Sequence, residues 1–237
     1  MAGKQSGFLM HDDASAHLKM GETSPRWLSG RAMNEGTMII KTVTVGELAT
    51  NCYITGDEKG VVIIDPGADS PQILKTVSSV PPSKIGGQAQ WPVASVILTH
   101  AHPDHIGAVD EVAGKLKCPI YMHGLDSDWL KGIFGSKFPG LHVVEEGGII
   151  KAGGVPFTIL HTPGHSEGSI CLYNEKEKVL FSGDTLFADG TGRTDLPGGD
   201  EEKMTASLKR LLALPAAVTV YPGHGEAALI SEIRGML

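Results

Sequence analysis

Thr99-His100-Ala101-His102-Pro103-Asp104-His105 contains three histidines and one aspartate in seven positions, the densest cluster of metal-ligand side chains in the sequence. Directly before it, Val93 to Leu98 is a short, apolar and mostly β-branched run that predicts a buried strand. His100 and His102 lie two positions apart at the end of this strand, and extended backbone turns such residues to the same side. Both imidazoles are therefore expected to reach one ion.

Asp104 and His105 continue the cluster after a proline that turns the chain. They lie at the start of a helix-like segment, residues 106–117, and should point away from the first two histidines. This arrangement suits two adjacent ions better than one. Imidazole favours zinc, iron or nickel, and the carboxylate widens the choice of metal.

The composition excludes some classes of function. The 237 residues fit one large domain or two small ones, and 41% of them are hydrophobic, which allows a sizeable core. The formal net charge of -7, from 20 basic and 27 acidic residues, argues against nucleic acid or an anionic membrane as a partner. The 31 glycines exceed the usual share of about 7% and indicate many tight turns between short strands.

Cys52, Cys118 and Cys171 are widely spaced and form no C-x-x-C pair, so we expect buried thiols in a reducing compartment rather than disulfides. No run of about 18 apolar residues is present to span a membrane. The amino terminus lacks the apolar segment and cleavage site of a secretory signal. We therefore expect a cytoplasmic protein. Residues 1–37 lack periodicity and are expected to form a flexible arm or leader ahead of one domain over 38–237.

From residue 38 the sequence predicts two sets of strands, each followed by helices, which indicates a two-sheet core with helices outside. Most of the strands are expected to pair as antiparallel hairpins. The expected strands cover 38–45, 51–55, 60–65, 93–98, 119–122, 149–151, 155–160, 169–173, 178–181 and 218–221. The expected helices cover 70–79, 106–117, 201–213 and a short segment from 226, whereas 126–141 is expected to be irregular with one helical turn.

Three further segments repeat one design, in which an apolar strand runs into a tight turn that carries a ligand type. A glycine directly precedes each of His165, Asp184 and His224, and glycine allows the backbone to approach a site closely. Together with the first cluster, these residues supply enough ligands for two ions. His100, His102 and His165 could hold one ion, and Asp104, His105 and His224 the other, with the two oxygens of Asp184 as a bridge.

The T-H-x-H-x-D-H motif, followed in order by His165, Asp184 and His224, resembles the metallo-β-lactamase superfamily over roughly residues 38 to 225. Within that superfamily the chain is most similar to short, single-domain glyoxalase II-like hydrolases. The residues that carry this similarity are Asp65-Pro66-Gly67, Ser182 to Phe187 and Gly192 to Asp200. The resemblance implies an α/β fold, a four-layer αββα sandwich of two mixed sheets with outer helices, and a binuclear site at one edge. It also implies hydrolysis of thioesters, typically S-lactoylglutathione or a related 2-hydroxyacyl thioester.

The chain departs from two-domain glyoxalase II in two respects. It ends 13 residues after His224, so we expect no carboxyl-terminal helical domain to help hold glutathione. Arg193 and Asp195 stand where the two-domain members carry Lys and Tyr. Arg193 could keep a cationic contact to a substrate carboxylate or could form a structural ion pair with Asp195 or Asp200, and these two interpretations remain open.

The mechanistic hypothesis is hydrolysis by a hydroxide that bridges two divalent ions, zinc for preference and iron or manganese as alternatives. A thiolate leaves readily because the pKa of a thiol is about 8.5, so no strong acid is required. Asp104 is expected to bind metal and to orient the nucleophile. Asp65, at the end of its strand, is expected either to accept an imidazole N–H or to cap a turn. The expected partner is a small-molecule thioester, with no nucleic acid or membrane.

Other functions on the same fold remain open. A persulfide dioxygenase resembles this chain in the segment Gly192 to Asp195 and would use one iron at the positions of His100, His165 and Asp184. Lactone hydrolysis would need the same hydroxide. A non-catalytic scaffold would be expected to have lost ligands, and none of the ligand positions is lost.

Overall fold

Two mixed β-sheets of six strands each, separated by a hydrophobic core, position the candidate site. The computed structural model describes residues 37–80, 83–85, 88–90, 93–134 and 140–236, which belong to one compact unit spanning Asn34–Leu237. Residues 1–36 of the expected arm over 1–37 lie outside the described residues. Among the helices that are described, none has the length and hydrophobicity needed to cross a bilayer.

The first sheet has the strand order β1-β2-β3-β6-β7-β8. Strands β1 to β3 form an antiparallel meander, whereas β3, β6, β7 and β8 pair in parallel. The strands cover Ile39–Val45, Thr50–Asp57, Gly60–Ile64, Val93–Ile97, Ile120–His123 and Leu141–Val144. Because β3 and β6 are parallel neighbours, their carboxyl ends meet at one edge and bring the segment after Ile64 next to the segment after Ile97.

The second sheet has the order β14-β13-β12-β11-β10-β9. Its strands cover Ile149–Ala152, Val155–His161, Ile170–Asn174, Val179–Gly183, Thr219–Pro222 and Ala228–Leu229, numbered β9 to β14. Only β12 and β13 run parallel among its described pairs, so the ends of these two strands also meet at one edge. The expectation of mostly antiparallel hairpins is therefore correct for this sheet and wrong for three of the five strand pairs of the first one.

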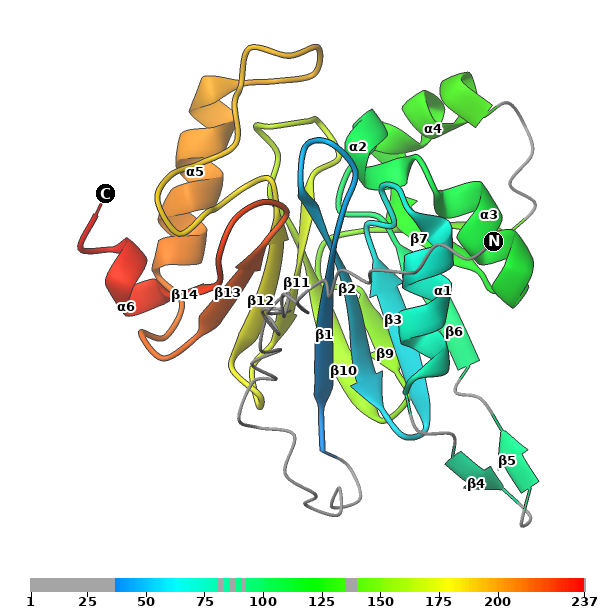
Figure 1. The fold of residues 1–237 in the computed structure, drawn as a ribbon. Helices are drawn as coiled ribbons and strands as arrows, with labels where there is room; N and C mark the ends of the chain where they lie inside the picture. The colour runs from blue at the N-terminus through cyan, green and yellow to red at the C-terminus, as the bar shows by residue number, and fades with distance from the viewer. Residues whose placement is uncertain (1–36, 81–82, 86–87, 91–92, 135–139, 237) are drawn as a thin grey trace, which may run out of the picture. The chain divides into compact units, whose positions relative to one another are not determined.

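Helices cover the outer face of each sheet (Figure 1). Helices α1, α2, α3 and α4, together with the short 3₁₀ helix η1, lie on the first sheet. Helices α5 and α6 cover the second sheet. Their bounds are Ser70–Ser78, Pro103–Ile106, Val109–Leu116, Gly124–Asp126, Ser127–Phe134, Glu201–Leu212 and Ile230–Ile233. The four-layer αββα order is thus confirmed. The Asp200 side chain accepts the Lys203 N–H and caps α5.

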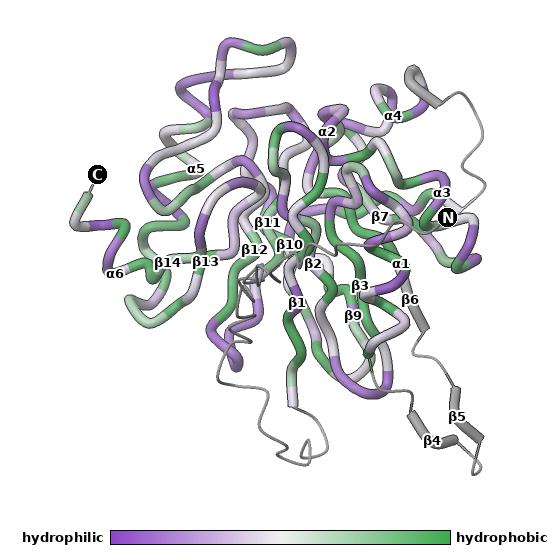
Figure 2. The backbone as a smooth tube through the Cα atoms, in the orientation of Figure 1, coloured by the Kyte–Doolittle hydropathy of each residue, from purple (hydrophilic) through white to green (hydrophobic). Residues whose placement is uncertain are grey.

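The core between the sheets consists of alternate strand residues that face each other. Tyr53, Ile64 and Ile97 from the first sheet pack against residues such as Phe157 and Phe181 from the second. Figure 2 shows the hydrophobic stretches on central strands such as β3, with hydrophilic stretches in the connecting loops. Successive side chains of a strand point to opposite faces of the sheet, so a strand with one buried face alternates apolar and polar residues. A strand with both faces buried is apolar throughout.

Several expected elements differ in the structure. The expected helix over 106–117 is two helices, because at Gly107 and Ala108 the chain packs against residues 66–67: a Cβ on Gly107 would lie 2.4 Å from the Gly67 carbonyl oxygen, and Ala108 N–H donates to Pro66 O. Residues 126–141, expected to be irregular, contain α4, whose Leu130 is fully buried.

Short strands were also missed. Strand β8 pairs in parallel with β7, which local sequence does not indicate. Residues 83–85 and 88–90, where no helix or strand was expected, form the antiparallel pair β4 and β5. The final helix was expected from residue 226. In the structure Ala228 and Leu229 first pair with β13 as strand β14, and α6 starts only at Ile230.

Replacing Phe181 by Ala should lower the free energy of unfolding by about 3–5 kcal/mol, since the ring is fully buried between the sheets and contacts Tyr53, Phe157 and Tyr221. Urea denaturation of both proteins measures the difference. Ile149→Ala is the control: its side chain is 65% exposed, so the change should stay within about 0.5 kcal/mol. Equal losses in the two variants would contradict this account of the core.

Candidate metal centre

Four strands end at the same edge of the sandwich and deliver the predicted ligands. His100 and His102 follow β6, His165 follows β10, Asp184 follows β12, and His224 follows β13. Asp104 and His105 lie in α2, which starts directly after His102. The predicted design of a strand that runs into a ligand-bearing turn is present at all four places.

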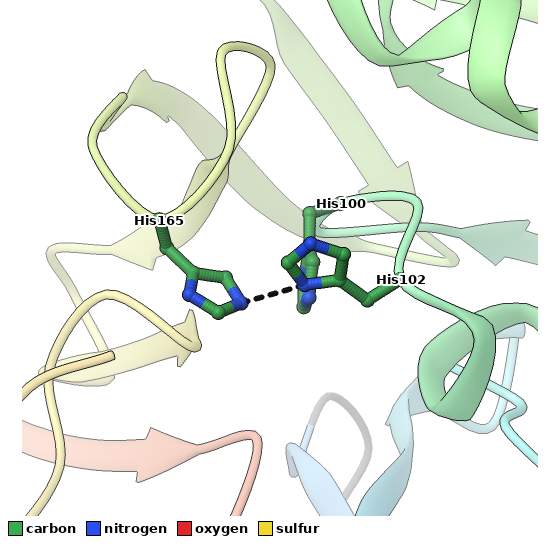
Figure 3. Close-up of side chains that lie close together, drawn as sticks. All are labelled: His100, His102 and His165. Carbon is green, nitrogen blue, oxygen red and sulfur yellow. Dashed lines mark hydrogen bonds between the residues drawn. The ribbon is translucent and has the colours of Figure 1, made fainter. Parts of the chain in front are cut away.

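Three imidazoles form the first cluster. Ligand atoms of His100, His102 and His165 all lie within 4.8 Å of one another. Figure 3 shows the three rings converging from two separate loops, with His102 Nδ1 2.8 Å from His165 Nε2. His100 Nε2 is buried without a hydrogen-bond partner. A buried, unpartnered nitrogen costs free energy unless something binds it, so this cluster fits a metal ion.

Asp104, His105 and His224 form the second cluster, also within 4.8 Å of one another. Each cluster draws two side chains from the segment after the first sheet's β6 and one from the second sheet. Asp104 Oδ2 lies 3.2 Å from His224 Nε2 and 3.4 Å from His105 Nε2. The Thr50 hydroxyl donates to the same oxygen at 3.0 Å and holds the carboxylate in place.

Asp184 lies between the two clusters. Its Oδ1 is 3.4 Å from His105 Nε2, and its Oδ2 is 3.5 Å from both His165 Nε2 and His224 Nε2. Oδ1 is buried and makes no hydrogen bond. One oxygen thus faces the second cluster while the other faces both, which is the position that a bridging carboxylate requires. The structure therefore brings together all seven side chains predicted as ligands.

Hydrogen bonds fix which imidazole nitrogen faces the site. His165 Nδ1 lies 2.8 Å from Arg193 O, and His224 Nδ1 lies 3.0 Å from Leu48 O. A carbonyl oxygen only accepts, so Nδ1 carries the proton in both rings and Nε2 is left to bind a metal. His105 Nδ1 is held in the same way at 3.0 Å from an Asp65 carboxylate oxygen.

Asp65 orients the ligands around it and has its own oxygens satisfied. It accepts the Thr99 N–H at 2.7 Å and the Thr99 hydroxyl at 2.6 Å, besides the His105 imidazole. Because the Thr99 hydroxyl proton goes to Asp65, its oxygen is free to accept from His100 Nδ1, 3.1 Å away. Asp65 also lies within ligand distance of His100 and His105, but its hydrogen bonds favour the predicted role of an imidazole acceptor.

Burial and neighbouring charges shift the pKa values of the ligand side chains in opposite directions. Burial lowers the pKa of His100 well below its ordinary value and lowers that of His102. For His105 burial acts in the same direction, but the negative charges of Asp184 and Asp65 outweigh it and raise the pKa to about 10. Burial alone would raise the pKa of Asp184, whereas the facing histidines hold it below its usual range. The carboxylates are therefore ionised at neutral pH, as metal ligands must be.

Glycines allow the close approach of these loops. Gly183 has a φ of +50°, and a Cβ there would lie 2.5 Å from Thr99 Oγ1. A Cβ on Gly223 would lie 2.1 Å from Asp184 Oδ1. A side chain would displace Thr99 at the first position and the ligand Asp184 at the second, so close packing explains why a glycine precedes the ligand in both places.

Asp126 is a buried residue that the sequence analysis missed. Its carboxylate accepts Ala101 N–H at 3.1 Å, Ser166 Oγ–H at 2.7 Å and Gly168 N–H at 2.7 Å. It therefore ties together the loops that carry the first cluster. In the sequence it reads as an ordinary residue before a helix, because two of its partners lie 40 or more positions away.

A cavity of about 690 Å³ opens beside the ligands and exposes His102, Asp104, His165, Asp184 and His224 to its interior. Arg193 lines it too, but its guanidinium forms two hydrogen bonds to the Asp195 carboxylate. The predicted contact of Arg193 with substrate thus competes with the ion pair, which was the alternative interpretation. His123 and His161 stack on each other and His142 stacks on Tyr121, and none of these three belongs to either cluster.

The fold and ligand order can now be compared with known proteins. Residues 45–224 match the profile of the Metallo-beta-lactamase superfamily. This chain belongs to that superfamily. It is similar to the probable metallo-hydrolase YqgX of Bacillus subtilis, with 35% identity over 81% of this chain and 93% of the relative. It is also 31% identical to the hydroxyacylglutathione hydrolase GloC of Haemophilus influenzae, over 82% of this chain and 94% of GloC.

Two solved structures show the same fold. The B3 metallo-beta-lactamase BLEG-1 superposes with a TM-score of 0.70 at 34% identity and covers 82% of this chain and 95% of its own. The di-iron-bound form of TTHA1623 gives a TM-score of 0.67 at 37% identity, over 81% and 96%. The superfamily and the two clusters together make the chain a metal-dependent hydrolase that binds divalent metal.

Loading the metal-free protein with zinc at pH 7 should release protons. His105 is protonated below its raised pKa of about 10, and a ligand imidazole must be neutral, so metal affinity should rise with pH up to that value. Calorimetric titration in two buffers of different ionisation enthalpy measures the protons released. Asp65→Asn removes one cause of the shift and should release fewer. Identical heats in both buffers would contradict the prediction.

Asp126→Asn should weaken zinc binding by about 10–100-fold, because an amide oxygen holds the two loops less firmly than a carboxylate. Competition with a chromophoric chelator measures the affinity. Asp128→Asn is the matched control, since Asp128 lies on the same segment with its side chain 88% exposed. The control should leave affinity unchanged. Unchanged affinity in Asp126→Asn would show that the loops keep their positions without this carboxylate.

Proposed function

We propose that the domain over residues 38–237 is a glyoxalase II-like thioester hydrolase that acts on a 2-hydroxyacyl thioester such as S-lactoylglutathione. One observation carries the proposal. Among the described residues that line the cavity, every imidazole and the Asp104 carboxylate belong to the two metal clusters, and the one other carboxylate is Asp184 between them. No separate side chain is left there to protonate a leaving group. A thiolate needs no such proton, since the pKa of a thiol is about 8.5.

The side chains around the cavity have distinct roles in this proposal. Two divalent ions, when bound, would lower the pKa of a water and polarise the thioester carbonyl. Asp104, fixed by the Thr50 hydroxyl, holds and orients the attacking water with its carboxylate. Asp65 keeps the His105 imidazole in the tautomer that presents Nε2. Asp126 holds the two loops of the first cluster at their separation.

The similarity to GloC supports a glutathione thioester as the first substrate to test. Zinc is proposed as the resident metal, with iron or manganese as the alternatives, and the di-iron form of TTHA1623 makes iron a concrete one. The proposed partner is a small molecule. Neither nucleic acid nor a membrane surface is proposed, in keeping with the net charge of -7.

Elemental analysis combined with an assay on S-lactoylglutathione tests the proposal. Two metal ions per chain and release of glutathione are expected. Asp184→Ala should lose metal and lower turnover at least about 100-fold, because it removes the carboxylate between the clusters. Asp189→Ala, an exposed residue of the following loop, is the control and should retain both. One iron per chain with oxygen uptake on glutathione persulfide, or turnover of lactones alone, would replace the thioesterase proposal.

A further inference from the structure

The cavity beside the metal clusters has an apolar wall that the hydrolytic chemistry does not use. The side chains of this wall come from separate helices and loops around the opening. They are Leu48, Pro103, Trp129, Phe187, Leu196 and Pro197. Leu48 is 67% exposed and Trp129 is 44% exposed. Large apolar side chains left open to water in a cleft next to reactive groups indicate the surface that binds an apolar part of a ligand.

Trp129 is held firmly in this wall. It lies on α4, which is anchored by the fully buried Leu130 next to it. The preceding turn is fixed by Asp126, whose carboxylate bonds both ligand loops. Trp129 also lines a small pocket of about 30 Å³ together with His102. Trp129 therefore lies beside the first cluster on an anchored helix, and its indole offers a large aromatic surface to a ligand.

The Arg193 guanidinium, which lines the cavity, forms an ion pair within the protein. Among the described lining residues Arg193 is the only Lys or Arg, and it pairs with Asp195 through Nε–Oδ1 and Nη2–Oδ2 distances of 2.7 and 2.6 Å. This two-pronged contact uses the Nε/Nη2 edge of the guanidinium, and the Asp195 charge neutralises much of the attraction that Arg193 would have for a substrate carboxylate. The pair is exposed and so individually weak, which means that Asp195 competes with an anionic substrate rather than excluding it.

We propose that, among thioesters with one acyl group, the site prefers those whose thiol portion is uncharged and apolar, that Trp129 binds this portion, and that Asp195 makes carboxylated thiols such as glutathione slower substrates of the same reaction. This inference rests on the proposed thioester hydrolysis and narrows its substrate class. An apolar thiol removes the exposed wall from water, which is favourable in proportion to the area covered. A carboxylated thiol such as glutathione must instead bind Arg193 beside Asp195 or in its place, and the negative charge of Asp195 repels the incoming carboxylate.

Three thioesters with one acyl group test the preference. The lactoyl esters of benzyl mercaptan, N-acetylcysteamine and glutathione differ only in the thiol, which is aromatic, short and neutral, or charged. The value of kcat/KM for the zinc-loaded protein should be highest for the benzyl ester, about tenfold above the glutathione ester. A higher value for the glutathione ester overturns the inference and leaves the thioesterase proposal standing.

Variants assign the preference to the two residues. Trp129→Ala should lower kcat/KM for the benzyl ester about tenfold through KM, and Trp129→Phe should recover most of it. Asp195→Asn should raise the glutathione-to-benzyl ratio of kcat/KM about threefold or more by freeing Arg193. Ile149→Ala, exposed and outside the cavity lining, should match the parent protein. Unchanged ratios in both the Trp129 and Asp195 variants would refute the assignment.

A binding measurement keeps the inference testable whatever reaction the site performs. Benzyl methyl sulfide and S-methylglutathione are thioethers and lack the acyl carbon that a thioesterase attacks. Titration calorimetry of the zinc-loaded protein should give tighter binding for benzyl methyl sulfide, and Trp129→Ala should reduce the difference. If neither thioester chemistry nor metal dependence is found, the proposed function fails on its own. If S-methylglutathione binds more tightly, the inference fails irrespective of the reaction.

Discussion

The carboxylate of Asp65 is the constraint on which the arrangement of the ligands depends. It stands at the end of β3 with a left-handed φ of +51° and is buried. Its oxygens accept from Thr99 and from His105, and through Thr99 they also set the orientation of His100. One charged group thus links the ends of two parallel strands and fixes a histidine in each cluster. A buried carboxylate is tolerated there because all of its hydrogen bonds are made.

The rest of the centre follows from where strands end. Parallel pairing of β3 with β6, and of β12 with β13, brings the carboxyl ends of both pairs to one edge. Ligands carried on strand ends inherit the rigidity of the sheets, which holds them within the small tolerance that metal coordination demands. The segments around the cavity contribute the apolar wall and the Arg193–Asp195 pair, which are the parts that would select a substrate.

Local signals made much of the fold and the ligand set predictable. An apolar run that ends in a turn with His or Asp is visible in the sequence, because both the strand and the turn depend on neighbouring residues. The four-layer architecture and the convergence of the seven side chains followed from this pattern and from the family resemblance. Asp65 was expected to accept an imidazole N–H or to cap a turn, and the structure shows the first of these.

Three of the missed features depend on partners that are distant in the chain. Strand β8 exists because β7 offers it a parallel edge, and its four residues carry too little pattern to reveal that. Asp126 acts on loops that lie about 25 and 40 positions away. The break between α2 and α3 arises where Gly107 meets the Gly67 backbone. Sequence periodicity contains no information about such contacts, so only the assembled structure shows them.

Each ligand cluster takes two side chains from the amino-terminal half of the sandwich and one from the carboxyl-terminal half. Neither half could complete a coordination sphere by itself. An ion held in either cluster would therefore act as a staple across two layers that are otherwise joined mainly by hydrophobic packing. The free energy that holds the two halves together should therefore rise with the concentration of free metal, because an ion that binds only the folded form shifts the folding equilibrium toward that form.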